Sequence, residues 1–266
     1  MRAFLDDIAQ ILGPTFDPEQ KAEGRSEREE KIAGTVLEKA SVIYAAAKKI
    51  GGVKSVNPVV AFLEHLVYKM KYSRISEGET QRYGAGPESF PAEELAVRQA
   101  IIDCCNSLVR DGLVQGTWGN VSVRTGEKEM LVTPSGIDYD KLTPDEIIRV
   151  NTDTLAFEPN GNLKPTSEKS LHAGIYKRRP DVGCVIHTHS TWCSVFAAAM
   201  QDHPHAKLAE YGTSGSEKLA KATAEALGDG IGAIMAHHGM VAVGKDMKTA
   251  YENALKLENE AKEYLA

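Results

Sequence analysis

Two patterns of hydrophobic and polar positions divide the chain near Pro91. Before this proline, apolar residues recur every three or four positions over 32–50 and over 57–72. Such spacing is typical of amphipathic helices. A polar stretch rich in glycine, glutamate and serine then leads to Pro91, and this composition is typical of a linker. We therefore predict a helical N-terminal extension over residues 1–90 and a second domain over residues 91–266.

After Pro91, short apolar runs alternate with amphipathic stretches, as expected for strands mixed with helices. Hairpin patterns outnumber crossover units, which favours an α/β domain with a mixed sheet. One predicted helix begins at Ser167, a good N-cap residue, and ends before Pro180. The expected strands are 120–134 as a hairpin with the loop TGEKE, 147–152, 155–160, 183–189 and 233–244 as a pair turning near Gly239, and the expected helices are 93–112, 167–180, 192–200, 216–228 and 247–265.

The composition favours a globular protein that acts on a small molecule. The 266 residues are 42% hydrophobic and carry a net charge of -6, whereas proteins that bind nucleic acids or membrane surfaces favour a basic face. No apolar run approaches the roughly 18 residues that cross a bilayer. The first residues lack the regions of a signal peptide, so we expect a cytoplasmic protein. The four cysteines show no CxxC spacing, and we interpret them as reduced core thiols.

Two histidines, His187 and His189, end the apolar run in CVIHTHSTWC. In an extended chain they project to the same side, roughly 7 Å apart by the strand rise, and such a pair can bind one metal ion. Catalytic zinc usually takes three protein ligands, so a third is needed. The AHHG segment supplies His238 as our first choice, and we interpret His237 as a packed residue. Spacing alone does not choose between these neighbours, because they point to opposite faces.

The segment LKPTSEKSLH has the features of an anion site. Pro165, Thr166 and Ser167 lead into a predicted helix, so free backbone N–H groups, two hydroxyls and the positive end of the helix dipole converge. A phosphate group suits this environment. Two turn segments, 116–120 and 133–136, join glycines to small polar side chains in the same manner.

Glu168 and His172 have an ordinary structural interpretation from the residues alone. A glutamate in the first helical turn complements the helix dipole. His172 lies one turn further on and is most simply a helix-face residue bonded to Glu168 or to core backbone. The spacing by itself therefore favours a structural role for both.

The order of these segments indicates more than each segment alone. QGTWGNVSVR, TPSGIDYDKL, KPTSEKSLH, HTH and HHG follow one another from about Ala92 to the C-terminus. This order resembles the class II aldolase/adducin-head family, most closely its L-fuculose-1-phosphate aldolase-like members. The resemblance implies a three-layer α/β/α fold with a central mixed, largely antiparallel sheet. It also implies an aldehyde-lyase that cleaves a ketose 1-phosphate to dihydroxyacetone phosphate and an aldehyde.

The resemblance also implies roles for individual residues. His187, His189 and His238 would bind Zn²⁺, or another divalent metal, which stabilises the enediolate formed on cleavage. Glu168 matches the glutamate of the family's PSSE motif and would act as the acid/base. The implied assembly is a homotetramer, in which the N-terminal helices pack or add subunit contacts. The residues implied to surround the substrate phosphate are Gly119, Asn120, Ser135, Gly136, Thr166 and Ser167.

The sequence departs from its relatives on the aldehyde side of the implied site. By the resemblance we expect a shorter segment after His189 and no counterpart of the relatives' tail within these 266 residues, and in the relatives those segments carry tyrosines that contact the aldehyde half. Tyr211 is the nearest candidate replacement, with a core or interface position as the alternative. The family also contains pentulose-phosphate 4-epimerases, which typically carry aspartate at the position of Glu168. It further contains adducin heads that serve as interaction modules and would be expected to lack the histidines.

Overall fold

The described N-terminal residues form a helical segment that contacts Gln115 and Gln201. Residues 41–50 are helical, in agreement with the prediction for 32–50. Lys39 Nζ donates to Gln115 Oε1 (2.7 Å), and Gln201 donates to the Ile50 carbonyl oxygen (2.9 Å). The predicted helix over 57–72 and the polar stretch up to residue 89 lie outside the described residues. The computed structural model describes residues 38–39, 41–50, 90–115 and 117–266.

Seven strands form one sheet in the order β3-β2-β1-β4-β7-β6-β5. Every neighbouring pair is antiparallel except β5 and β6, which are parallel. The predicted mixed, largely antiparallel sheet is therefore confirmed. The strands are β1 Gly119–Gly126, β2 Glu129–Val132, β3 Ile148–Asn151, β4 Cys184–Thr188, β5 Lys207–Ala209, β6 Gly232–Met235 and β7 Gly239–Gly244.

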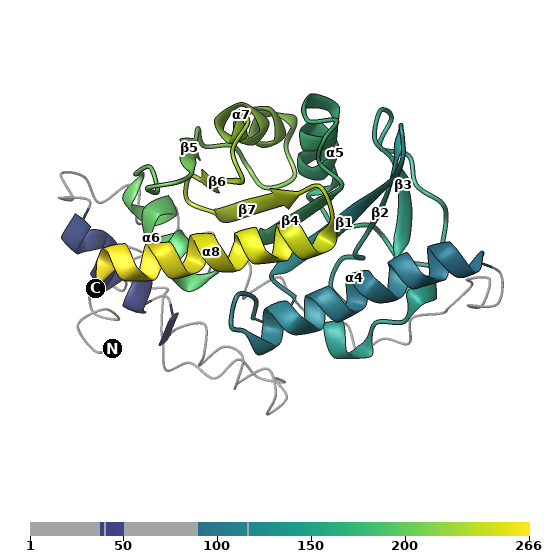
Figure 1. Ribbon diagram of the computed structural model, residues 1–266, viewed down its shortest axis with the longest axis horizontal. Coiled ribbons are helices and arrows are strands. Elements are labelled where there is room, and N and C mark those ends of the chain that lie inside the picture. Colours follow the sequence, from purple (N-terminus) through teal and green to yellow (C-terminus); the bar gives the residue numbers. More distant parts are fainter. Residues whose placement is uncertain (1–37, 40, 51–89, 116) are drawn as a thin grey trace, which may run out of the picture.

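Helices cover both faces of the sheet, which confirms the three-layer arrangement (Figure 1). On β4, Cys184 and Ile186 pack in the apolar cluster under α4, α6 and α8, whereas Val185 packs under α5 and α7. This alternation follows from the two-residue period of a strand. Among the described helices, none combines the length and apolarity that a membrane span requires. The helices are α4 Ala92–Arg110, α5 Lys169–Arg178, α6 Thr191–Ala199, α7 Glu217–Leu227 and α8 Met247–Leu265, with short 3-10 turns at Tyr139–Lys141 and Pro144–Glu146.

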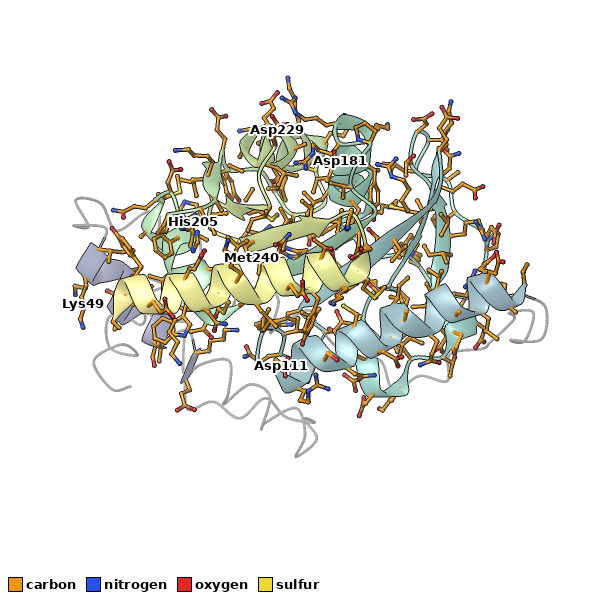
Figure 2. All side chains as sticks on the ribbon, in the orientation of Figure 1. Lys49, Asp111, Asp181, His205, Asp229 and Met240 are labelled. Atoms are coloured by element: carbon orange, nitrogen blue, oxygen red, sulfur yellow. The ribbon has the colours of Figure 1, made fainter. Side chains whose placement is uncertain are left out.

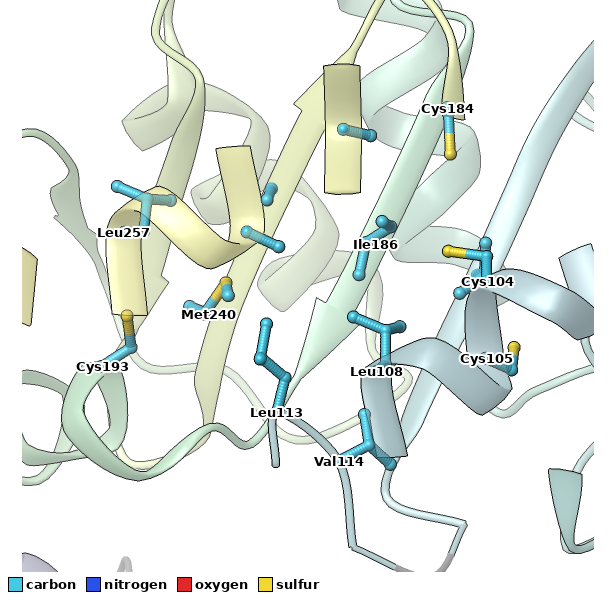
Figure 3. Packing of buried hydrophobic residues seen from close by; sticks show 14 of the residues in the cluster. Cys104, Cys105, Leu108, Leu113, Val114, Cys184, Ile186, Cys193, Met240 and Leu257 are labelled. Carbon is cyan, nitrogen blue, oxygen red and sulfur yellow. The ribbon is translucent and has the colours of Figure 1, made fainter. Parts of the chain in front are cut away.

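The core beneath α4 and α8 holds all four cysteines (Figure 3). They are free and buried, so the prediction of reduced core thiols is confirmed. Burial raises the pKa of the Cys104 thiol to about 12 and raises the pKa values of Cys105, Cys184 and Cys193 well above their ordinary value. Where α4 ends, Asp111 accepts a hydrogen bond from the Tyr251 hydroxyl of α8 (Figure 2).

The start of α5 differs from the prediction. Ser167 is not the N-cap: Glu168 occupies that position, and its side chain makes no capping bond. Instead the Thr166 hydroxyl accepts a hydrogen bond from the Glu168 N–H (3.3 Å), and the Thr166 carbonyl accepts one from Lys169 (3.2 Å). Because Thr166 satisfies these first donors, the Glu168 side chain is free of a capping role.

One predicted strand is absent, and one observed strand was not predicted. The segment 155–160 is not a strand: it makes only isolated bridges, from Phe157 to Val150 and from Asn160 to Leu163. The cause lies just before it, where Asn151 Oδ1 accepts the N–H groups of two following residues and Leu155 has a φ of +60°. This turn changes the direction of the chain, so the residues after it do not continue as a regular strand. β5 was missed because three residues carry no detectable alternation.

Gly239 controls how closely β7 approaches the end of β4. A Cβ at this position would lie 2.4 Å from the Thr188 carbonyl oxygen and 3.1 Å from His189 Cδ2. Gly239→Ala should therefore lower the free energy of unfolding by about 1–3 kcal/mol, as overpacking does. Gly126→Ala is the control, because its nearest neighbour would be 3.7 Å away, and it should change stability by less than about 0.5 kcal/mol. Urea unfolding measures both, and equal stabilities would contradict the close approach.

Candidate active site

Three histidines lie together where β4 and β7 meet. His187 lies in β4, His189 follows the end of that strand, and His238 lies in the turn between β6 and β7. Their ring centroids are 4.8–4.9 Å apart, and one nitrogen of each ring lies within 4.8 Å of the others. The three side chains, which we call the histidine cluster, are 1%, 4% and 2% exposed. The structure thus brings together the three predicted ligands.

The turn between β6 and β7 decides which of two adjacent histidines joins the cluster. His237 has a left-handed backbone with a φ of +55°, and its N–H donates to the Ala197 carbonyl oxygen (3.1 Å). Its ring packs beside Tyr211, with centroids 5.7 Å apart. His238 therefore faces the cluster and His237 does not. Tyr211 is 49% exposed, so a core position is excluded, and an interface position stays a prediction.

The proton positions of the cluster suit a bound metal. His187 Nδ1 lies 2.9 Å from the carbonyl oxygen of Met240, which Figure 2 labels on β7. A carbonyl oxygen only accepts, so Nδ1 carries a proton, and Nε2 is the ring nitrogen that faces the cluster. That Nε2 lies 3.0 Å from His189 Nε2. Three buried imidazoles, one of them anchored by a backbone carbonyl, would hold one divalent ion.

Glu168 lies against this cluster and is 1% exposed. Its Oε2 lies 3.0 Å from His187 Nε2, and its Oε1 lies 3.1 Å from His238 Nε2. Burial raises the pKa of the Glu168 carboxyl, but the two imidazoles outweigh burial and hold that pKa well below its ordinary value. The carboxylate is therefore ionised at neutral pH. The main contacts of the Glu168 side chain are with His187 and His238, so complementing the helix dipole is not its main role.

Two further groups donate hydrogen bonds to this carboxylate. Asn120 Nδ2 donates to Oε2 (3.3 Å), and the Ser214 hydroxyl donates to Oε1 (3.0 Å). The oxygen of Asn120 contacts His172 Nε2 (2.5 Å), so both ends of the amide are engaged. His172 also contacts the Ser122 hydroxyl (2.6 Å). The expectation that His172 bonds Glu168 or core backbone is wrong, because Asn120 stands between the ring and the carboxylate.

The other residues of the expected phosphate site form one edge beside this centre. A bridge between Pro134 and Pro165 joins the turn segment 133–136 to the segment 164–167 before α5, and the Ser135 N–H donates to the Lys164 carbonyl oxygen (2.8 Å). Three of the predicted residues, Ser135, Gly136 and Ser167, are exposed on these adjacent segments.

Thr166 and Gly119 are buried and have structural contacts of their own. The Thr166 N–H donates to the Thr133 carbonyl oxygen (3.0 Å), which ties the start of α5 to the end of β2. A Cβ on Gly119 would lie 2.7 Å from a methyl group of Val114 and 2.9 Å from the His187 carbonyl oxygen. Glycine at 119 therefore permits the close packing that places Asn120 next to Glu168.

The comparison with known proteins agrees with this geometry. The family model "Class II Aldolase and Adducin N-terminal domain" matches residues 99–265. The chain belongs to the class II aldolase/adducin family. A 5-methylthioribulose-1-phosphate/5-deoxyribulose-1-phosphate aldolase from Rhodospirillum rubrum is 33% identical over 187 residues, covering 66% of this chain and 83% of the relative. The L-fuculose phosphate aldolase of Escherichia coli K12 is 34% identical over 185 residues, covering 65% and 84%.

A solved structure of an L-fuculose 1-phosphate aldolase has the same fold. It superimposes with a TM-score of 0.60 and 30% sequence identity, covering 64% of this chain and 84% of the other. The resemblance stated from the sequence motifs is confirmed at the level of the family. Class II aldolases depend on a metal ion, and the histidine cluster is the place in the described part of this chain where three such ligands converge.

Sequence reasoning missed several residues that support the class II aldolase site. Glu258 of α8 accepts the N–H groups of Trp192 (2.8 Å) and Cys193 (2.9 Å), and so caps α6 directly after His189. No spacing rule links Glu258 or Ser214 to the site, because each belongs to a separate segment. Three others, His172, Tyr176 and Ser122, were visible as spacing: residues 172 and 176 share one helix face with Glu168, and residue 122 shares one strand face with Asn120.

The cluster predicts which histidine substitutions abolish metal binding. His189→Ala and His238→Ala should each lose the bound ion, because two imidazoles hold a divalent metal far more weakly than three. His237→Asn is the matched control: it removes the adjacent imidazole, and asparagine tolerates a positive φ. Metal analysis after gel filtration should find about one ion per chain in the wild type and in the control. Full metal content in either alanine variant would remove that histidine from the ligand set.

Proposed function

We propose that the chain is a metal-dependent aldolase that cleaves a ketose 1-phosphate to dihydroxyacetone phosphate and an aldehyde. The relatives named above are aldolases of 5-methylthioribulose 1-phosphate, 5-deoxyribulose 1-phosphate and L-fuculose phosphate, and we infer a substrate of this class. Zinc as the metal, a homotetrameric assembly and a cytoplasmic location stay predictions.

The observation that carries the proposal is the position of one buried, ionised carboxylate against three converging imidazoles. Glu168 reaches two members of the histidine cluster at 3.0 and 3.1 Å. An interaction module has no need for a carboxylate buried in this way, because burying a charge is costly unless nearby groups compensate. A structural zinc site is disfavoured as well, since such sites are closed by four protein ligands.

Retro-aldol cleavage requires a group that both takes and gives a proton. The bond between C3 and C4 breaks, the C4 hydroxyl loses its proton as the aldehyde forms, and C3 gains one. A divalent ion held by the cluster would supply Lewis-acid stabilisation of the negative charge that develops on the ketose oxygens. Glu168 is ionised and adjacent, so its carboxylate can accept a proton and return it to carbon. Asn120 and Ser214 hold its two oxygens in place.

The phosphate group of the substrate would bind at the edge formed by the two joined segments. Ser135, Gly136 and Ser167 are exposed there, and the N-terminus of α5 favours negative charge. Binding the phosphate at a fixed place would bring the carbonyl end of the ketose to Glu168 without further search. A screen of phosphorylated ketoses for release of dihydroxyacetone phosphate by the metal-loaded protein tests the proposal directly.

Glu168→Gln separates an aldolase from a protein that only binds metal. Glutamine keeps the shape but cannot carry the proton, so cleavage should fall roughly 10²–10⁴-fold, the usual contribution of general acid–base catalysis. The variant should keep its metal, and proton exchange on dihydroxyacetone phosphate should fall with cleavage. The control is Glu146→Gln, a buried glutamate that caps the turn at 144–146. Glu168→Gln rates within about threefold of wild type would be evidence against the acid/base role.

Ser167→Ala tests the phosphate edge. Loss of one hydrogen bond to a charged group is worth about 1.5–3 kcal/mol, so kcat/KM for a ketose 1-phosphate should fall roughly ten- to hundredfold. An unphosphorylated ketose, which lacks the charged partner, should lose little. Steady-state kinetics with both substrates give the comparison, and equal losses would argue that Ser167 does not contact the phosphate.

A further inference from the structure

A line of five buried polar side chains runs from α5 to the carboxylate in the site. Tyr176 Oη lies 2.8 Å from Ser122 Oγ, which lies 2.6 Å from His172 Nδ1. His172 Nε2 lies 2.5 Å from Asn120 Oδ1, and Asn120 Nδ2 lies 3.3 Å from Glu168 Oε2. None of the five is more than 7% exposed. We call this line the donor chain.

The direction of each hydrogen bond follows from the last member of the donor chain. Asn120 Nδ2 donates to Glu168 Oε2, so the amide presents its NH₂ group to the carboxylate and its oxygen to His172. That oxygen only accepts, so His172 carries its proton on Nε2 and presents a lone pair on Nδ1. Ser122 donates to that lone pair and accepts from the Tyr176 hydroxyl. One arrangement of protons therefore satisfies all four contacts.

We propose that His172 is a positioning residue, whose Nε2–H tautomer fixes which end of the Asn120 amide faces Glu168. If the amide turned over, its oxygen would meet the carboxylate and its NH₂ group would meet the His172 N–H, so two attractive contacts would become repulsive. The inference rests on the proposed function, since it takes Glu168 as the group that moves the proton.

The surroundings of His172 hold its ring in this one state. Burial lowers the pKa of His172 to about 3, and nearby His187 acts in the same direction, whereas Glu168 opposes them. The ring is therefore neutral at working pH and has two tautomers to choose from. The members of the donor chain stand on α5 and β1, and Arg124 lies over the Tyr176 ring, 4.6 Å from its centroid. Rigid elements thus present every donor.

The tautomer itself can be measured without any enzyme assay. Long-range ¹H–¹⁵N NMR spectra of the metal-free protein should show His172 neutral and protonated on Nε2 between pH 5 and pH 8, assigned by its loss in His172→Gln. In Ser122→Ala, which removes the donor to Nδ1, the share of the Nδ1–H tautomer should rise. A wild-type His172 protonated on Nδ1, or one that titrates in this range, would overturn the proposal.

Variants of His172 test the consequence for turnover. His172→Gln keeps an N–H donor near the position of Nε2, whereas His172→Leu removes it. We expect His172→Leu to lose about 10–100-fold in kcat, the usual effect of a supporting hydrogen bond, with KM changed less than about threefold and full metal content. His172→Gln should recover most of this loss. Ile175→Val, a core change on the same helix, should keep wild-type kcat.

The outcomes separate the two proposals. If the wild type releases no dihydroxyacetone phosphate, the proposed function fails, while the NMR result still stands or falls alone. If the wild type is active and the glutamine and leucine variants lose kcat equally, or lose it only together with metal or KM, His172 is a packing residue and the inference is wrong. Should His172→Leu fail to fold, Tyr176→Phe takes its place, and an unchanged kcat and tautomer there would equally overturn the proposal.

Discussion

The pairing of β4 with strands on both of its sides is the constraint on which the site depends. Because β4 runs antiparallel to β1 and to β7, its register sets His187 opposite Asn120 on one side and Val241 on the other. The next residue, Thr188, pairs with Gly119 and Met240, so β1 begins at Gly119 opposite Thr188 and β7 begins at Gly239, one residue beyond that level. The end of β4 therefore lies between the first residues of β1 and β7, and the histidine cluster lies at this end of the strand.

The cost of burying Glu168 explains the polar groups around it. A carboxylate that is 1% exposed would be unstable without partners. Imidazoles compensate it from the sheet, Asn120 from β1 and Ser214 from the loop before α7. These partners come from four separate segments, and each reaches the carboxylate only if the three layers are assembled. The acid/base geometry is therefore a property of the whole domain.

The sequence could predict the three histidines of the cluster, because two of them follow from the two-residue period of a strand and the third directly precedes a turn glycine. The pairing of His187 with His189 follows from strand alternation. The preference for His238 over His237 came from its place before the turn glycine and from the family resemblance, and its physical reason, a φ of +55° at His237, cannot be read from the sequence. The N-cap prediction at Ser167 failed because Thr166 supplies both the side-chain and the carbonyl acceptor. Ser214 could not be found from local patterns, because its partner lies 46 residues away.

The residues proposed to hold the metal and to transfer the proton stand on different elements, and this separation has a physical consequence. The cluster stands on β4 and the turn after β6, held by ladder hydrogen bonds, whereas Glu168 stands at the start of α5, held by Thr166 and by the join between the two proline-containing segments. A change at the start of α5 leaves the ladder intact, since β1, β4 and β7 do not pair with it. A substitution at the start of α5 could therefore abolish proton transfer while the metal stays bound. The buried hydrogen bonds from Asn120 and Ser214 orient the Glu168 carboxylate and not the histidine cluster.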